Sequence, residues 1–174
     1  MVNQITTLFC DIGGVLLTNG WDRNIRKNAA EQFDMDFEEF ENRHQLCFYL
    51  FEIGKISLKE YLEETVFYKE RSFTMEKFID FMHAQSKPYD EMIAFVKELK
   101  DKYHLKVVIL SNEGRELTDY RQKKFALTDF ADFFVVSSYV HLRKPDKDIF
   151  QLALDLVQTP PESIIYIDDR GWFI

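Results

Sequence analysis

The chain has 174 residues, of which 46% are hydrophobic and 17 are phenylalanine, so it is long enough and apolar enough to bury a substantial core. Its net charge of −8 and its pI near 5.0 argue against nucleic acid or an anionic membrane as a partner. Two cysteines, Cys10 and Cys47, provide no disulfide framework, and the sequence has no apolar run of membrane-spanning length, so we expect a cytoplasmic protein.

The first predicted strand, residues 5–11, carries Asp11 to its C-terminal end. Gly13 and Gly14 follow, and they allow a sharp turn and a close approach of the backbone to a ligand. A carboxylate at the end of a buried parallel strand lies where open α/β sheets place their chemistry. Asp11 is therefore a candidate functional residue, whereas Cys10 should point to the opposite face and belong to the core.

Residues 19–87 read as consecutive helices with no convincing strand between them. Capping-box patterns at residues 36–39 and 57–60 predict two of the helix starts. His44 lies on one of these helices, where a lone histidine is more often structural or solvated than a ligand. We therefore leave His44 out of the predicted site.

After this helical block, strands and helices alternate. The predicted strands are residues 106–111, 133–137 and 163–168, and the predicted helices are residues 90–101, 116–124 and 146–157. Alternation of elements of this length predicts a parallel sheet with right-handed crossovers. Pro145 is expected to open the last of these helices, because proline is favoured at the first helical position.

Two of the apolar segments end in polar groups, Ser111 and Asn112 in one case and Asp168 and Asp169 in the other, and Lys144 stands between them in the chain, directly before Pro145. With Asp11 they form, in chain order, the parts of a phosphoryl-transfer site. The carboxylate of Asp11 attacks phosphorus, while Ser111 and Lys144 hold the phosphoryl oxygens. The acidic pair binds a divalent cation, and oxygen-only ligands suit Mg²⁺. Asn112 is a weaker candidate for a further hydrogen bond to the phosphoryl group.

These motifs in this order resemble those of the haloacid dehalogenase-like hydrolase superfamily. The resemblance implies an α/β fold with a Rossmann-like parallel sheet, helices on both faces, and an inserted α-helical cap. Residues 1–18 and 88–174 would form the core and residues 19–87 the cap. It also implies that Asp11, the backbone carbonyl of Gly13 and Asp169 hold Mg²⁺, with Asp168 assisting. Residues 52–57 resemble a stretch common in such caps.

Two features depart from the family pattern. Most phosphatases of the superfamily carry a second aspartate two residues after the nucleophile, as general acid and base, and this chain has Gly13 there. The variant resembles a subgroup that includes glucose-1-phosphate phosphatases, and it leaves protonation of the leaving group to water, the substrate or another residue. The chain also stops soon after Asp169, where family members continue with a helix and an edge strand, so a C-terminal unit is expected to be missing.

The sequence thus predicts a Mg²⁺-dependent phosphomonoester hydrolase that acts on a small phosphorylated metabolite through an aspartyl-phosphate, with sugar phosphates among the candidates. A 2-haloacid dehalogenase is an alternative, because ester formation at carbon needs no acid for the leaving group and no metal. A catalytically weak or inactive binding or regulatory protein is the other alternative, motivated by Gly13 and the abrupt C-terminus. The sequence does not specify the oligomeric state.

Overall fold

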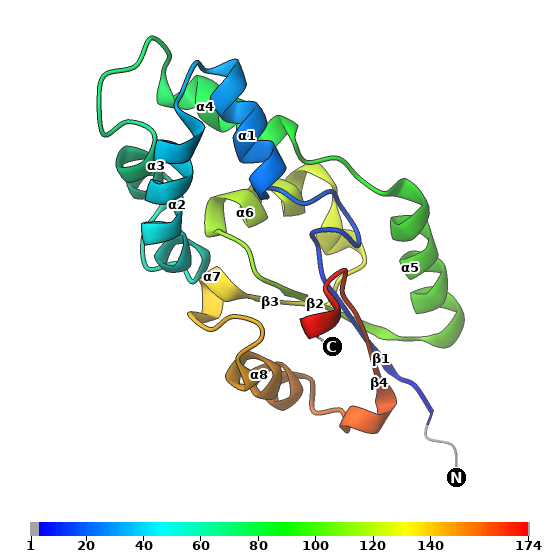
Figure 1. The fold of residues 1–174 in the computed structure, drawn as a ribbon. Coiled ribbons are helices and arrows are strands. Elements are labelled where there is room, and N and C mark those ends of the chain that lie inside the picture. Colours follow the sequence, from blue (N-terminus) through cyan, green and yellow to red (C-terminus); the bar gives the residue numbers. More distant parts are fainter. Residues whose placement is uncertain (1–3, 174) are drawn as a thin grey trace.

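The computed structural model describes residues 4–173, which form a parallel β-sheet flanked by helices (Figure 1). The strands are β1 (Thr7–Cys10), β2 (Lys106–Ser111), β3 (Phe133–Val136) and β4 (Ile164–Ile167). Their order in the sheet is β3-β2-β1-β4, and the three pairings are parallel. The predicted α/β class and parallel sheet are confirmed, and each strand lies within its predicted range.

Helices cover both faces of the sheet, as predicted (Figure 1). The two main covering helices are α5 (Asp90–Tyr103) and α8 (Lys147–Val157). Because side chains alternate along a strand, Cys10 packs on one face with Val96 of α5, and Phe9 packs on the other face with Ile149 of α8. Cys10 is fully buried and is the small core residue that the sequence predicted.

Four helices between β1 and α5 form a separate layer, which we call the helical insert. They are α1 (Arg23–Gln32), α2 (Phe37–Glu52), α3 (Leu58–Thr65) and α4 (Met75–Ala84). The insert has an aromatic core of its own around Phe40, Tyr61 and Phe78, and Figure 1 shows it above the C-terminal ends of the strands. The absence of strands from this block is as predicted.

The two predicted capping boxes differ in the structure. Ser57 and Glu60 make both reciprocal hydrogen bonds at the start of α3. At the start of α2, Asp36 accepts a hydrogen bond from the Glu39 N–H, but the Glu39 carboxylate pairs with Arg43 and Lys69 instead of reaching back. The capping box predicted at residues 36–39 therefore forms only one of its two hydrogen bonds, because Arg43 and Lys69 compete for the Glu39 carboxylate.

The remaining elements are α6 (Arg115–Lys124), η1 (Leu127–Asp129), α7 (Ser137–Val140), η2 (Pro161–Ser163) and η3 (Gly171–Phe173). The prediction that Pro145 opens α8 is wrong. Asp146 is the N-cap, and its carboxylate accepts a hydrogen bond from the Asp148 N–H at 3.2 Å. An aspartate satisfies the free N–H groups at a helix start, so α8 begins at Lys147, after the proline.

The chain enters and leaves the helical insert through two segments that lie side by side. The Thr18 N–H donates to the Lys87 carbonyl at 2.9 Å, and the Tyr89 N–H donates to the Leu16 carbonyl at 2.9 Å. We call residues 16–18 and 86–89 together the connecting ribbon. The hydrogen bonds join the two connections, so a movement of one is coupled to the other.

Strand β4 lies at one edge of the sheet, where Ile165 is 46% exposed. An apolar hollow of about 360 Å³ lies between this edge and α5, and it is lined by Gln4, Ile5, Leu8, Leu99, Tyr103, Leu105, Ile165 and Ile167. The missing C-terminal unit stays a prediction. Within residues 4–173, no helix combines the length and apolar character needed to cross a membrane.

Candidate active site

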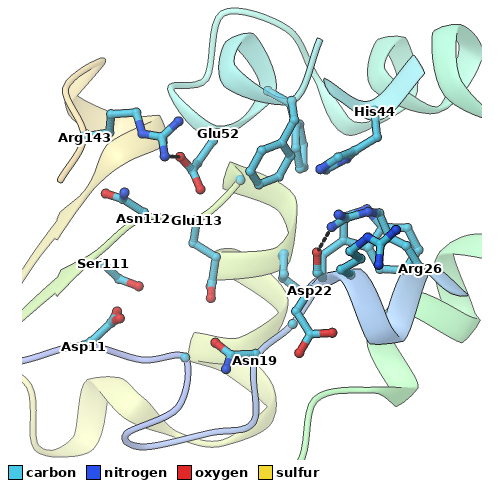
Figure 2. Close-up of a pocket in the computed structure, with 18 of the residues that line it drawn as sticks. Asp11, Asn19, Asp22, Arg26, His44, Glu52, Ser111, Asn112, Glu113 and Arg143 are labelled. Carbon is cyan, nitrogen blue, oxygen red and sulfur yellow. Dashed lines mark hydrogen bonds and ion pairs between the residues drawn. The ribbon is translucent and has the colours of Figure 1, made fainter. Parts of the chain in front are cut away.

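A cavity of about 330 Å³ lies between the C-terminal ends of the central strands and the helical insert (Figure 2). Its floor comes from the end of β2 and from the segments that follow β1 and β2, which contribute Asp11, Gly13, Ser111 and Asn112. Its roof comes from the insert. The cavity is therefore at the edge of the sheet where the sequence placed the chemistry.

Asp11 follows β1 directly and is held there by the backbone. Its N–H donates to the Ile167 carbonyl at 3.0 Å, and its Oδ1 accepts the Ile12 N–H at 2.7 Å. Its Oδ2 lies 3.1 Å from the Lys144 Nζ. Burial raises the pKa of the Asp11 carboxyl, although Lys144 and the Ser111 hydroxyl act to lower it. Additional positive charge beside Asp11 would therefore favour its ionised form.

Lys144 is fully buried, and its ammonium group is surrounded by carboxylate and carbonyl oxygens. Its Nζ lies 2.5 Å from the Asp168 Oδ2 and donates to the Leu110 carbonyl at 3.1 Å. The Asn112 side chain holds its backbone, since Oδ1 accepts the Lys144 N–H at 2.8 Å and Nδ2 donates to the Lys144 carbonyl at 2.9 Å. Asn112 thus positions the lysine, and its contact with a phosphoryl group stays a prediction.

Asp11, Asp168 and Asp169 each offer a carboxylate oxygen, and these oxygens lie within 4.8 Å of one another. The two aspartates of the acidic pair, Asp168 and Asp169, differ in burial and in their hydrogen bonds. Asp168 accepts hydrogen bonds from Lys144, the Tyr166 hydroxyl and the Arg170 N–H. Burial opposes its ionisation, but these hydrogen bonds hold the pKa of Asp168 below its usual range. Asp169, in contrast, is exposed and makes fewer hydrogen bonds.

The loop after Asp11 is shaped by close contacts. Gly14 has a φ of +75°, and a side chain there would collide with the Asp169 carboxylate. A Cβ at Gly13 would lie 2.9 Å from the Asn19 Oδ1. The Asn19 Nδ2 lies 3.4 Å from the Asp169 Oδ2. The space beside Gly13, where many relatives are expected to carry a second aspartate, is therefore occupied by the amide of Asn19.

Ser111 ends β2, is buried, and lines the cavity beside Asp11. The structure thus brings together the complete predicted set: Asp11, Gly13, Ser111, Asn112, Lys144, Asp168 and Asp169. They meet because parallel strands end at the same edge of the sheet.

The helical insert adds residues that sequence reasoning did not assign to the site. The cavity is also lined by Trp21, Arg26, His44, Phe48, Phe51 and Glu52. The His44 Nδ1 lies 2.7 Å from the Tyr61 hydroxyl, and burial together with the nearby Arg26 lowers the pKa of His44 to about 3. His44 is thus a neutral, hydrogen-bonded residue, although it does reach the cavity. Apart from the resemblance of residues 52–57 to family caps, the sequence holds no signal for these residues.

The profile of the haloacid dehalogenase-like hydrolase family matches residues 5–172. The chain belongs to this family. The match includes the strand before Asp11, the helical insert and the acidic pair, so it covers the fold and the site together. A family of hydrolases identifies the protein as a hydrolase, in agreement with the sequence motifs.

Solved structures share this fold. A haloacid dehalogenase (HAD) family enzyme from Bacteroides thetaiotaomicron is 21% identical, with a TM-score of 0.81 over 98% of this chain and 87% of that one. A predicted HAD-like hydrolase from Porphyromonas gingivalis is 22% identical, with a TM-score of 0.75 over 98% of this chain and 85% of that one. The L-2-haloacid dehalogenase from Xanthobacter autotrophicus is 17% identical, with a TM-score of 0.65 over 98% of this chain and 72% of that one.

Proposed function

We propose that this hydrolase is a Mg²⁺-dependent phosphomonoester hydrolase that acts on a small phosphorylated metabolite. The observation that carries the proposal is the convergence of Asp11, Asp168 and Asp169 within 4.8 Å beside the buried Lys144. Three carboxylates around one lysine repel one another unless a further cation is present. The Bacteroides thetaiotaomicron enzyme has been crystallised with magnesium and inorganic phosphate, which supports the same chemistry here.

The residues of the chain divide the reaction between them. The Asp11 carboxylate forms a bond to phosphorus while the bond from phosphorus to the leaving oxygen breaks, which gives an aspartyl-phosphate and an alcohol. Ser111 and Lys144 stabilise charge on the transferring phosphoryl oxygens, since both lie next to Asp11. Water then hydrolyses the aspartyl-phosphate and regenerates the carboxylate.

The donor set fits Mg²⁺, because it contains only oxygen ligands. Asp11, the Gly13 carbonyl and Asp169 would hold the ion, and the hydrogen-bonded Asp168 would assist mainly by orienting Lys144. When bound there, Mg²⁺ supplies positive charge that favours ionised Asp11 and neutralises phosphoryl oxygens.

Residues 19–87 act in this proposal as a cap over a core formed by residues 1–18 and 88–174. The cavity combines aromatic faces from the insert side, such as Trp21 and Phe48, with polar groups such as Gln45 of the insert and Arg143 of the core. Such a mixture suits a small polyhydroxylated leaving group, because aromatic rings pack on its C–H faces while polar groups bind its hydroxyls. A sugar phosphate is therefore the substrate class to test first.

The dehalogenase alternative remains chemically possible through Asp11 alone, and the Xanthobacter autotrophicus neighbour was crystallised with chloropropionic acid covalently bound. The acidic pair favours the phosphatase, because a metal-free reaction at carbon has little use for Asp168 and Asp169 beside the nucleophile. Halide release from 2-chloropropionate without Mg²⁺ would support dehalogenation.

Release of inorganic phosphate from p-nitrophenyl phosphate and a panel of sugar phosphates tests the proposal. Activity should require Mg²⁺, be lost with EDTA, and be lost in Asp11→Asn. Asp101→Asn changes an exposed aspartate of α5 in the same way and should keep full activity. Persistent activity of Asp11→Asn in EDTA would contradict the mechanism, and a wild-type chain inactive on every phosphate would favour a binding or regulatory role.

A further inference from the structure

The proposed reaction leaves one proton unassigned. The departing oxygen must be protonated as its bond to phosphorus breaks, yet Gly13 has no side chain and Asn19 fills the space beside it. An amide is not an acid at neutral pH, so Asn19 does not replace the aspartate. A protein acid, if the site has one, must come from elsewhere in the cavity wall.

Besides Asp11, the cavity wall holds four carboxyl or imidazole groups, which can be compared by the hydrogen bonds and ion pairs that they already make. Glu113 is bound at both oxygens, by Arg121 at 2.5 Å and by the Thr118 hydroxyl at 3.1 Å. His44 is neutral and bound to Tyr61, as described above. Asp22 is the N-cap of α1, where it accepts the Ile25 N–H at 2.9 Å. Each of these three has a structural partner that accounts for it.

Glu52 is the exception. It is the last residue of α2 and is only 7% exposed, and its Oε2 lies 2.9 Å from the Arg143 Nη2. Within residues 4–173 its carboxylate accepts no well-oriented hydrogen bond, although buried carboxylates are normally well bonded. Figure 2 shows this side chain reaching down from α2 toward Asn112 and Glu113, on the side of the cavity opposite Asp11.

The core fixes the end of α2 in this position. The Ser137 hydroxyl donates to the Glu52 carbonyl at 2.6 Å, and the His141 Nδ1 lies 2.7 Å from the Ile53 carbonyl. Arg143, which faces Glu52, directly precedes Lys144, which faces Asp11. One short segment of the core therefore holds the nucleophile on one side of the cavity and Glu52 on the other.

The charge around Glu52 suits an acid. Burial raises its pKa, and Asp11 across the cavity acts in the same direction, while Arg143, Arg170 and Lys144 act to lower it. The balance lies above the ordinary range, which increases the protonated fraction near neutral pH. General acids work best when their pKa lies near the working pH.

We propose that Glu52, supplied by the helical insert, is the general acid and base of this hydrolase. This inference rests on the proposed phosphatase function. The protonated carboxyl donates its proton to the leaving oxygen as Asp11 bonds to phosphorus and the ester bond breaks. The resulting carboxylate accepts a proton from the water that attacks the aspartyl-phosphate, which restores protonated Glu52 and releases phosphate.

The test is the dependence of kcat/KM on leaving-group pKa, measured with a series of aryl and alkyl phosphates on wild type and Glu52→Gln. The wild type should show a shallow dependence, because its acid supplies the proton. Glu52→Gln should show a steep one, with a loss of about 10²–10⁴-fold for alkyl phosphates and a much smaller loss for p-nitrophenyl phosphate. Glu38→Gln removes an exposed carboxylate from the same helix and should behave as wild type.

Glu52→Asp keeps an acid at a shorter reach, so it should retain the shallow dependence at a reduced rate, whatever the fate of the amide variant. Parallel dependences in wild type, Glu52→Gln and Glu52→Asp would overturn the role of Glu52 and leave the phosphatase assignment intact. A wild type without Mg²⁺-dependent phosphatase activity would overturn the proposed function, and the role of Glu52 with it.

Discussion

Glu113 and Glu52 both line the cavity and both pair with an arginine, Arg121 and Arg143 respectively, but the surroundings of the two pairs differ. Arg121 is fully buried, and beyond Glu113 it donates to the Ser86 hydroxyl at 3.0 Å and the Thr18 carbonyl at 2.9 Å. Arg143 is 30% exposed and joins Glu52 through a single ion pair. Burial raises the pKa of both glutamates. A buried carboxylate with complete hydrogen bonds serves the structure, whereas one with few remains available for chemistry.

The first pair also acts at a distance from the chemistry. Thr18 and Ser86 belong to the two segments of the connecting ribbon, so Arg121 links α6 of the core to both ends of the helical insert. Glu113 supplies the charge that allows an arginine to be buried there. The second pair links the insert to the core beside the reacting groups. The two pairs thus hold the same two layers together at different points.

Removal of Arg121 should have the largest effect on stability of the changes considered for these two pairs. Arg121→Met leaves Glu113 buried without its partner, and the free energy of unfolding should fall by about 3–5 kcal/mol, because an uncompensated buried charge is costly. Urea unfolding followed by circular dichroism measures this. The double variant Arg121→Met, Glu113→Gln should recover part of the loss. If Arg121→Met is as stable as wild type, the Glu113–Arg121 pair does not stabilise the contact between the core and the connecting ribbon.

A pH effect from His44 should be intermediate in size. Its pKa is about 3 in the folded chain against an ordinary 6.5, chiefly because it is buried. Below pH 6.5 the unfolded chain therefore binds a proton that the folded chain does not, and stability contributed above pH 6.5 is lost as the pH falls toward 3. Over the first pH unit below 6.5, the free energy of unfolding should fall by up to about 1.4 kcal/mol.

Comparison of wild type with His44→Gln isolates this contribution, because glutamine can accept the Tyr61 hydrogen bond without titrating. The difference between their stabilities should narrow on acidification. An equal pH dependence of both chains would mean that His44 titrates normally. The same variant separates the titration of His44 from that of Glu52, because His44→Gln should leave the pH profile of kcat/KM unchanged.

Loss of Arg143 should have the smallest effect on stability and a distinct effect on activity. Arg143→Met removes a partly exposed ion pair, so the free energy of unfolding should change by about 1 kcal/mol or less. Arg143 also lowers the pKa of Glu52, so its removal should raise that pKa and move the alkaline limb of kcat/KM to higher pH. A limb that stays in place would mean that another group controls it.

The sequence predicted the parts of the site that follow from strand ends. Asp11, Ser111 and the acidic pair each come directly after a short apolar run, and parallel strands bring such positions to one edge. Lys144 follows no strand, and its motif order alone predicted its place. The local rules failed where neighbours decided the outcome, as at Pro145, where Asp146 capped the helix instead.

The roof of the cavity could not be predicted in the same way. Glu52 is the last residue of α2, and the motif at residues 52–57 does not indicate which segment of the core Glu52 contacts. Asn19 lies in a loop before α1. The position of Glu52 depends on how the insert docks on Ser137 and His141, and that of Asn19 on its contact with Asp169, all distant in sequence. Helical periodicity predicts which residues are buried, but not what they face.

The connecting ribbon has a mechanical consequence for the proposed chemistry. Two hydrogen-bonded segments resist sliding and twisting, because either motion stretches the two backbone hydrogen bonds between them together, and they bend more easily across their length. The insert should therefore move relative to the core by rotation about a single axis at the connecting ribbon. Each closure would return the side chain of Glu52 to the same point across the cavity from Asp11, whatever path the substrate took on entry.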